Sequence, residues 1–188
     1  MIKQEIVQRA YQIPGWAWPM ELGVLWDELS SSKSHLEVGT FCGKSLLVSA
    51  CAMPPESKLV WVDPLLTWGN MVSQEWIHTV LHATLDEIQR LVPRTIEGHR
   101  TTFLDFANQC KEKFHTVYLD ADHHYAETKA AIEIARSLLE EDGVIYGHDY
   151  WSVDLGVMDA VHEMCPRFSV FPNTRIWRYQ PCVDGVKK

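Results

Sequence analysis

Short apolar runs alternate with longer helix-like segments along most of the chain. The runs are rich in Val, Leu and Ile, and apolar residues recur at three- and four-residue spacing in the segments between them. The predicted strands are His35–Val38, Leu59–Val62, Arg94–Glu97 (the weakest), Thr116–Leu119 and Gly143–Tyr146, and the predicted helices between them are Ser45–Ala52, Glu75–Leu91, Phe103–Lys113 and Ala126–Leu139. Such alternation is typical of βαβ units, so we expect a parallel sheet with helices on both faces.

The two ends of the chain depart from this alternation. The first part, about residues 1–33, predicts two helices: Gln4–Tyr11, and a second that begins after Pro19 and stops at Ser30–Ser32. The last part predicts a helix at Leu155–Met164 and strands at Phe168–Phe171 and Arg175–Tyr179. Because only a short turn joins these two strands, they must pair antiparallel.

Composition limits the classes of protein that remain. The length of 188 residues suits a single domain, residues 1–188. With 17 Lys and Arg against 25 Asp and Glu, the formal charge of −8 disfavours a nucleic-acid partner. No apolar run is long enough to span a membrane and the N-terminus does not resemble a secretion signal, so we expect a soluble, cytoplasmic protein. The five cysteines show no C-x-x-C spacing, which favours reduced thiols.

A glycine-rich loop follows the first predicted strand. It reads Glu37-Val38-Gly39-Thr40-Phe41-Cys42-Gly43-Lys44-Ser45. Three residues separate the two glycines, whereas the phosphate-binding loop of nucleotide hydrolases needs four, so that class is set aside. Gly39 permits a tight turn, and Glu37 suits a cationic ligand such as the ammonium group of an amino acid. An ordinary turn is the alternative.

The next two strands also end in candidate binding residues. Asp63 follows the second strand about twenty residues after the glycine loop, where a carboxylate can accept hydrogen bonds from both hydroxyls of a ribose. An Asp before a Pro also starts many turns. After the third strand, His99 and Arg100 lie in a polar loop, Gly98–Thr102, that could contact an adenine or could be an ordinary surface loop.

Acidic and imidazole side chains follow the fourth and fifth strands. The fourth leads into Asp120-Ala121-Asp122-His123-His124, and the fifth leads into His148-Asp149. Because parallel strands end at one edge of a sheet, these groups should converge there, as a divalent metal site or as a general base beside one. The alternative is that the histidines cap the next helix.

The motifs together resemble class I S-adenosylmethionine (SAM)-dependent methyltransferases, over Pro14–Tyr179. The segment 37–45 looks like their first motif and Val62-Asp63-Pro64 like their ribose-binding motif. Residues 119–125 with 143–150 look like the paired motifs of the small-molecule O-methyltransferase group that includes macrocin-type sugar enzymes. The resemblance implies a doubly wound α/β fold with a mostly parallel, seven-stranded sheet of order 3-2-1-4-5-7-6, in which strand 7 is antiparallel.

The resemblance also implies roles for individual residues. Glu37 and Gly39 would contact the methionine part of SAM, Asp63 the ribose, and His99 and Arg100 the surroundings of the adenine. The implied cofactor-binding set is completed by Thr40, Gly43, Ser45 and Asp120.

In metal-dependent relatives, the positions of Asp120, His148 and Asp149 would bind magnesium or manganese, and Asp122 would be the general base. His148 stands where those relatives carry Asp, and an imidazole suits softer ions or proton transfer better than magnesium. His123 and His148 are therefore further candidates for proton transfer.

The implied function is O-methylation of a hydroxylated small molecule, a sugar or a secondary metabolite. The alternatives are a non-catalytic SAM-binding or assembly module and a nicotinamide-dependent oxidoreductase, which the missing third glycine of Gly-x-Gly-x-x-Gly disfavours. Trp16, Trp18 and Trp151 are candidates for a lid over the acceptor, with core packing as the alternative. Since the N-terminal segment is short, a neighbouring subunit of a homo-oligomer could complete the site.

Overall fold

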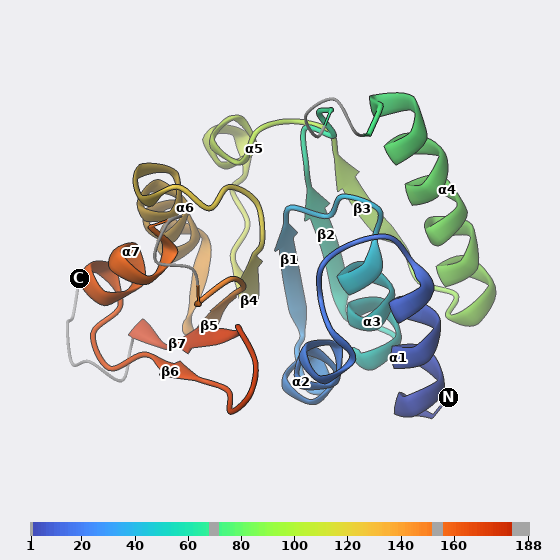
Figure 1. Cartoon of the computed structure of the whole chain (residues 1–188), viewed down its shortest axis with the longest axis horizontal. Coiled ribbons are helices and arrows are strands. Elements are labelled where there is room, and N and C mark those ends of the chain that lie inside the picture. The colour runs from blue at the N-terminus through green and yellow to red at the C-terminus, as the bar shows by residue number, and fades with distance from the viewer. Residues whose placement is uncertain (1, 68–71, 152–155, 182–188) are drawn as a thin grey trace.

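A seven-stranded sheet forms the centre of the computed structural model, which describes residues 2–67, 72–151 and 156–181 (Figure 1). The strands are β1 (Ser34–Val38), β2 (Lys58–Val62), β3 (Ile96–His99), β4 (Phe114–Leu119), β5 (Leu139–Gly147), β6 (Ser169–Val170) and β7 (Trp177–Tyr179). The helices are α1 (Lys3–Gln12), α2 (Pro19–Leu29), α3 (Lys44–Ala52), α4 (Gln74–Leu91), α5 (Phe103–Gln109), α6 (Tyr125–Leu138) and α7 (Val157–Met164). None of these helices is long and apolar enough to cross a membrane.

The order of the strands is β3-β2-β1-β4-β5-β7-β6, as predicted. The pairs β1–β2, β1–β4, β2–β3 and β4–β5 are parallel, whereas β7 pairs antiparallel with both β5 and β6. The predicted fold class is therefore confirmed. In this topology the carboxyl ends of β1, β2, β4 and β5 lie at one edge, where a ligand site is expected.

Helices cover both faces of the sheet because its central strands are apolar on both sides. In β2, Leu59 and Trp61 pack with α1 to α4, while the alternate residues Val60 and Val62 pack with α5 to α7. Figure 1 shows these two helical layers on either side of the sheet. The continuous apolar runs in the sequence reflect this burial on both faces.

Two predicted elements were displaced. The third strand begins at Ile96 instead of Arg94, because the Arg94 guanidinium is buried and donates to the carbonyls of Met53 and Pro54 at the end of α3. The helix predicted at 103–113 ends at Gln109, because Cys110 is extended and the chain turns toward β4. Both predicted boundaries were wrong by two to four residues, and the first of them affects the site.

The other predicted elements are present, with some shifted ends: β5 begins at Leu139 instead of Gly143, and β7 begins at Trp177 instead of Arg175. β5 is longer than predicted, and its register with β4 shifts between Phe114 and Thr116. The helix predicted from Leu155 is seen from Val157, and Leu155 itself lies outside the described residues. Cys42, Cys51, Cys110 and Cys165 are free thiols, and Cys182 lies outside the described residues.

Replacement of Gly147 by Ala tests the packing of β5 against β7. A Cβ at this position would lie 2.2 Å from Cζ2 of Trp177, its partner in the strand register, whose side chain is fully buried. We expect Gly147→Ala to lower the free energy of unfolding by about 1–3 kcal/mol, as overpacked cores do.

Gly23→Ala in α2 is the matched control. Its Cβ would lie 3.5 Å from the nearest atom, Cε of Lys3, so the change should stabilise the helix by about 0.5–1 kcal/mol. Urea unfolding of both variants measures the difference. A Gly147→Ala variant as stable as the parent protein would contradict the described packing.

Candidate functional site

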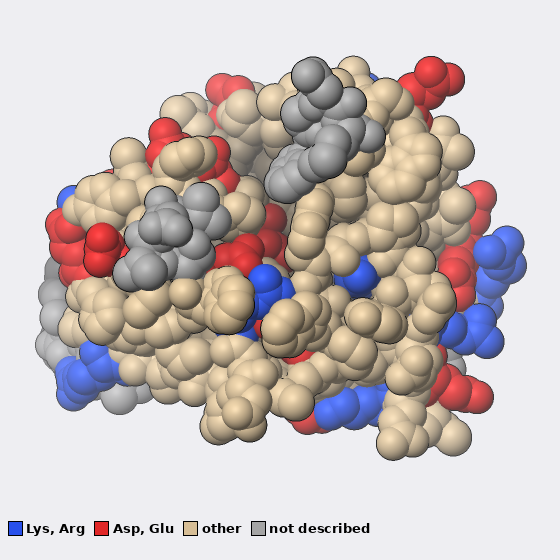
Figure 2. Space-filling model, viewed as in Figure 1, with Lys and Arg blue, Asp and Glu red and all other residues tan. Residues whose placement is uncertain are grey.

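A cavity of about 880 Å³ lies at the carboxyl edge of the sheet. Figure 2 shows it as a central hollow with acidic side chains inside and basic side chains at its margin. Five carboxylates line it but only two Lys or Arg side chains do, among the described residues; they are Asp63, Asp120, Asp122, Glu127 and Asp149, with Lys44 and Arg175. The surplus of carboxylates suits a ligand that carries positive charge.

The glycine loop forms one wall of this cavity. Gly39 has a φ of 90°, and a Cβ at this position would lie 1.9 Å from the backbone oxygen of Asp120, so only glycine lets β1 and β4 end so close together. Gly43 does not line the cavity. It has a φ of 85° and caps the start of α3. Thr40 and Ser45 do line the cavity, as predicted for residues that contact a ligand.

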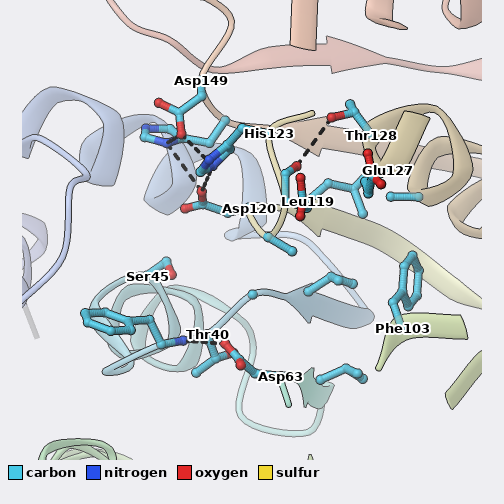
Figure 3. A pocket seen from close by; sticks show the side chains of 18 of the residues that line it. Thr40, Ser45, Asp63, Phe103, Leu119, Asp120, His123, Glu127, Thr128 and Asp149 are labelled. Carbon is cyan, nitrogen blue, oxygen red and sulfur yellow. Dashed lines mark hydrogen bonds and ion pairs between the residues drawn. The ribbon is translucent and has the colours of Figure 1, made fainter. Parts of the chain in front are cut away.

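Asp63 joins the loops that follow β1 and β2. Its Oδ2 accepts a hydrogen bond from the backbone N of Phe41 at 2.8 Å, and its Oδ1 accepts one from the backbone N of Leu65 at 2.6 Å (Figure 3). Each carboxylate oxygen has a second lone pair, and Asp63 lines the cavity. Its carboxylate is therefore fixed in place and can still accept hydrogen bonds from two hydroxyl groups of a ligand.

Glu37 lies beneath the glycine loop and does not line the cavity. Its fully buried carboxylate accepts hydrogen bonds from the hydroxyls of Thr40, Ser45 and Ser49, at 3.1–3.3 Å. Burial raises the pKa of Glu37 to about 8, although these hydroxyls oppose the shift. The structure thus places Glu37 as a support that ties the loop to α3, not as a residue in direct contact with a ligand.

His99 and Arg100 are not brought into the cavity. Because β3 extends to His99, this side chain lies outside the main cavity, against Phe106 and with Nε2 2.7 Å from Oε1 of Glu97. Both residues line a separate hollow. In the segment between β3 and the first turn of α5, the residues that line the main cavity are Thr102, Phe103 and Leu104. The cap Thr102-x-x-Asp105, which begins α5, is the sequence signal that could have marked this position.

An ionic cluster forms the opposite wall. His123 Nε2 lies 2.9 Å from Oδ2 of Asp149 and 3.9 Å from Oδ1 of Asp120. His148 Nδ1 lies 3.3 Å from the same oxygen of Asp149 and 3.5 Å from the same oxygen of Asp120. Figure 3 shows Asp120, His123 and Asp149 converging across the cavity from Thr40 and Asp63. The predicted convergence of the fourth and fifth strand ends is therefore present.

Two members of the cluster come from segments that sequence reasoning missed. Glu21, on α2, is fully buried, and its Oε2 lies 3.1 Å from Nε2 of His148. Arg175, between β6 and β7, donates to both carboxylate oxygens of Glu21 and, at 3.0 Å, to Oδ1 of Asp149. Pro19 and Glu21 mark a helix N-terminus in the sequence, but nothing local marks either charge as part of a site.

The cluster shifts the pKa of each histidine upward. Burial alone would lower the pKa of His148, but Asp120, Asp149 and Glu21 outweigh burial and raise it to about 12. Interaction with Asp120 and Asp149 raises the pKa of His123 to about 9. Although burial opposes ionisation, the two histidines lower the pKa of Asp149 well below its ordinary value. At neutral pH the cluster thus pairs three carboxylates with two imidazolium ions and one guanidinium.

Asp122 stands apart from this cluster. Its side chain is 52% exposed, and its Oδ1 accepts hydrogen bonds from the backbone N and Nδ1 of His124, at 2.8 and 2.6 Å. Although partial burial opposes ionisation, these bonds lower the pKa of Asp122. Of the aromatic lid candidates, Trp16 and Trp151 line the cavity, whereas Trp18 stacks under the Arg175 guanidinium.

The expected metal ligands do not fit a magnesium ion. Magnesium prefers oxygen ligands in octahedral geometry. Here both ring nitrogens of His148 face carboxylates, and Arg175 occupies one oxygen of Asp149. Among the described residues, two groups have ligand atoms within 4.8 Å of one another: Asp120, His123 and Asp149, and the exposed Asp122, His124 and Glu127; neither includes His148. The predicted set Asp120, His148 and Asp149 is therefore corrected: His148 lies inside an ion-pair cluster, and no step is derived through a metal.

Comparison with solved structures gives the same fold in several methyltransferases, two of the following three being O-methyltransferases. One from Bacillus cereus, in complex with SAH (S-adenosylhomocysteine), has a TM-score of 0.68 and 19% identity, over 96% of this chain and 92% of that one. TomG from Streptomyces achromogenes, involved in tomaymycin synthesis and in complex with SAM, has a TM-score of 0.65 and 18% identity, over 93% and 86%. The SAH-bound Podospora anserina methyltransferase PaMTH1 has a TM-score of 0.65 and 12% identity, over 94% and 86%.

No curated protein matches the chain. A family model described as a methyltransferase domain matches residues 36–150, which is more than half of the 188 residues. The matched segment runs from β1 through the glycine loop and Asp63 to the rim at His148 and Asp149. The chain therefore belongs to this family of methyltransferase domains.

Proposed function

We propose that the protein transfers a methyl group from SAM to a hydroxyl oxygen of a small molecule. One observation carries this proposal: two features line the same cavity. Asp63 has a carboxylate placed to accept hydrogen bonds from ribose hydroxyls, and the His123 imidazole lies near the carboxylates of Asp120 and Asp149. The cavity volume lies in the usual range for ligand pockets. The O-methyltransferases from Bacillus cereus and Streptomyces achromogenes, which share the fold, support the choice of cofactor and of oxygen as the acceptor atom.

The cofactor would lie along the wall formed by the glycine loop. In this arrangement the loop around Gly39 receives the methionine part and Asp63 accepts hydrogen bonds from the ribose hydroxyls. Phe103 and Leu104 offer apolar surface to the adenine, in place of the predicted His99 and Arg100. Asp120 and the other acidic residues favour the positive charge of the sulfonium, which stabilises binding and not the transition state.

When bound, SAM supplies a methyl group on a positively charged sulfur. The chain must then hold a hydroxyl in line with that methyl group, accept its proton and exclude water. We assign proton acceptance to Nδ1 of His123, because this side chain lines the cavity and its other ring nitrogen, Nε2, faces Asp149 and Asp120, which stabilise the imidazolium that forms. Trp16 and Trp151, at the cavity, would limit the access of water.

The other two candidates fit the role of base less well. Asp122 is engaged by His124, and its lowered pKa makes it a weaker base. Only 2% of the His148 side chain is exposed, and carboxylates face both of its nitrogens. We therefore assign His148 a positioning role, in which its charge orients Asp120 and Asp149 around His123. The acceptor in this proposal is a hydroxylated small molecule, such as a sugar or a secondary metabolite.

The cofactor assignment predicts that Asp63 contributes to the affinity for SAH. Removal of hydrogen bonds to a charged group costs about 1.5–3 kcal/mol, so Asp63→Ala should weaken SAH binding about tenfold or more. Calorimetric titration measures this, and Asp86→Ala, an exposed carboxylate on α4, is the matched control. Failure of the parent protein to bind SAH would contradict the proposal, and equal affinity in Asp63→Ala would remove Asp63 from the site.

The assignment of His123 predicts a pH dependence. The imidazole accepts a proton only when it is neutral, and its pKa is raised to about 9, so kcat/KM should rise with pH and level off above about 9. We expect His123→Gln to lower kcat/KM about 100- to 10,000-fold and to abolish this rise. Asp122→Asn, the control, should retain most of the activity.

The measurement follows SAH formation from SAM with a panel of phenols, catechols and sugars, in buffer that contains EDTA. Rates are then determined with the best acceptor. Loss of activity in Asp122→Asn with survival in His123→Gln would reverse the assignment of the base. Activity that appears only after magnesium is added would contradict the metal-free site.

A further inference from the structure

Lys44 is a buried cation in the cavity wall, and no carboxylate of the described residues pairs with it. It is the first residue of α3, is only 7% exposed and lines the cavity beside the glycine loop. Its Nζ donates to the backbone oxygen of Gly15 at 2.7 Å and lies 5.2 Å from the centre of the Tyr11 ring. Within residues 2–67, 72–151 and 156–181, no carboxylate lies in ion-pair distance of this Nζ.

A buried ammonium group beside neutral groups alone is costly, which indicates that something else offsets its charge. Burial lowers the pKa of Lys44 for the same reason. The start of α3 adds to the positive potential, because Gly43 gives no side-chain cap and the first turn holds no acidic residue. Two independent features therefore favour an anionic group at this end of the cavity.

The rest of the cavity cannot hold an anion as well. Its five carboxylates repel negative charge, and the other cations of the wall among the described residues are already paired: Arg175 with Glu21 and Asp149, and the imidazolium ions of His123 and His148 with Asp149. SAM and SAH each carry one anionic group, the α-carboxylate of the amino-acid part. Figure 3 shows Ser45, which follows Lys44 in the chain, on the side of the cavity that would receive this part.

We infer that Lys44 binds the α-carboxylate of the cofactor, and that this contact distinguishes the intact cofactor from analogues that lack the carboxylate. The inference rests on the proposed function and extends it, since Lys44 stands outside the predicted cofactor-binding set. The hydrogen bond from Lys44 to the backbone oxygen of Gly15 connects the carboxylate-binding residue to the segment that precedes Trp16. Binding of the carboxylate is therefore coupled to the position of this part of the cavity wall.

The test compares SAH with decarboxylated SAH, which keeps the adenosine, the sulfur and the amine but lacks the carboxylate. Both are titrated calorimetrically into the parent protein, Lys44→Met and Lys33→Met. Methionine preserves the apolar stem of the lysine, and Lys33 is an exposed control outside the cavity.

We expect Lys44→Met to bind SAH about 10- to 100-fold more weakly and decarboxylated SAH with unchanged affinity, which also shows that the variant is folded. Lys33→Met should match the parent protein with both ligands. Unchanged SAH affinity in Lys44→Met would overturn the inference. Equal losses for both ligands would also overturn it and would leave Lys44 only its structural bond to Gly15. If the parent protein binds neither ligand, the proposed function itself fails.

Discussion

The ion pair between Glu21 and Arg175 holds together the wall of the cavity that carries the ionic cluster. Glu21 is fully buried and accepts hydrogen bonds from the backbone N, Nε and Nη2 of Arg175, at 3.0–3.1 Å. The same guanidinium reaches Asp149 and the backbone oxygen of Trp16. Loss of one partner would leave a buried charge unpaired, at a cost of about 3–5 kcal/mol. The position of α2, the turn before β7 and the end of β5 therefore depend on this pair.

The alternation of charge explains the division of roles within the site. Along the cluster, Glu21 is paired with Arg175 and His148, and Asp149 is paired with Arg175, His148 and His123. The Arg175 guanidinium and the two imidazolium ions thus lie around these carboxylates, in the positions that a metal ion would have to occupy. The side chains of Glu21 and His148 are almost fully buried, whereas that of His123 is partly exposed. Within the cluster, His123 therefore combines exposure to the cavity with a pKa near the range in which a base operates.

Much of this arrangement could be predicted from the sequence. Gly39, Asp63, Asp120 and Asp149 each follow a predicted strand, and parallel strands bring such residues to one edge of a sheet. Their convergence needed no knowledge of side-chain packing. The short turn between the last two strands predicted that they pair antiparallel, and the family resemblance added the order of the strands, with β7 inserted between β5 and β6.

The failures have identifiable causes. His99 was predicted at the cofactor site, but the buried Arg94 shifts the start of β3 by two residues and His99 lies outside the main cavity. Glu37 was predicted to contact the cofactor, but the alternation of side chains along β1 turns it toward α3. Glu21 and Arg175 lie 154 positions apart, and only tertiary packing brings them together. Segment 37–45 includes Lys44 but assigns it no role of its own, because its burial without an acidic partner among the described residues is visible only in three dimensions.

In this structure the chain itself supplies the cations that pair with the carboxylates of the ionic cluster: the imidazolium ions of His123 and His148 and the guanidinium of Arg175. A titration of the histidine side chains by ¹⁵N NMR tests it most directly, because nitrogen shifts distinguish an imidazolium from neutral tautomers. The account predicts that His148 stays doubly protonated through neutral and mildly alkaline pH, while His123 loses its proton near pH 9. A neutral His148 at pH 7, or a His123 that titrates near its ordinary pKa, would contradict it.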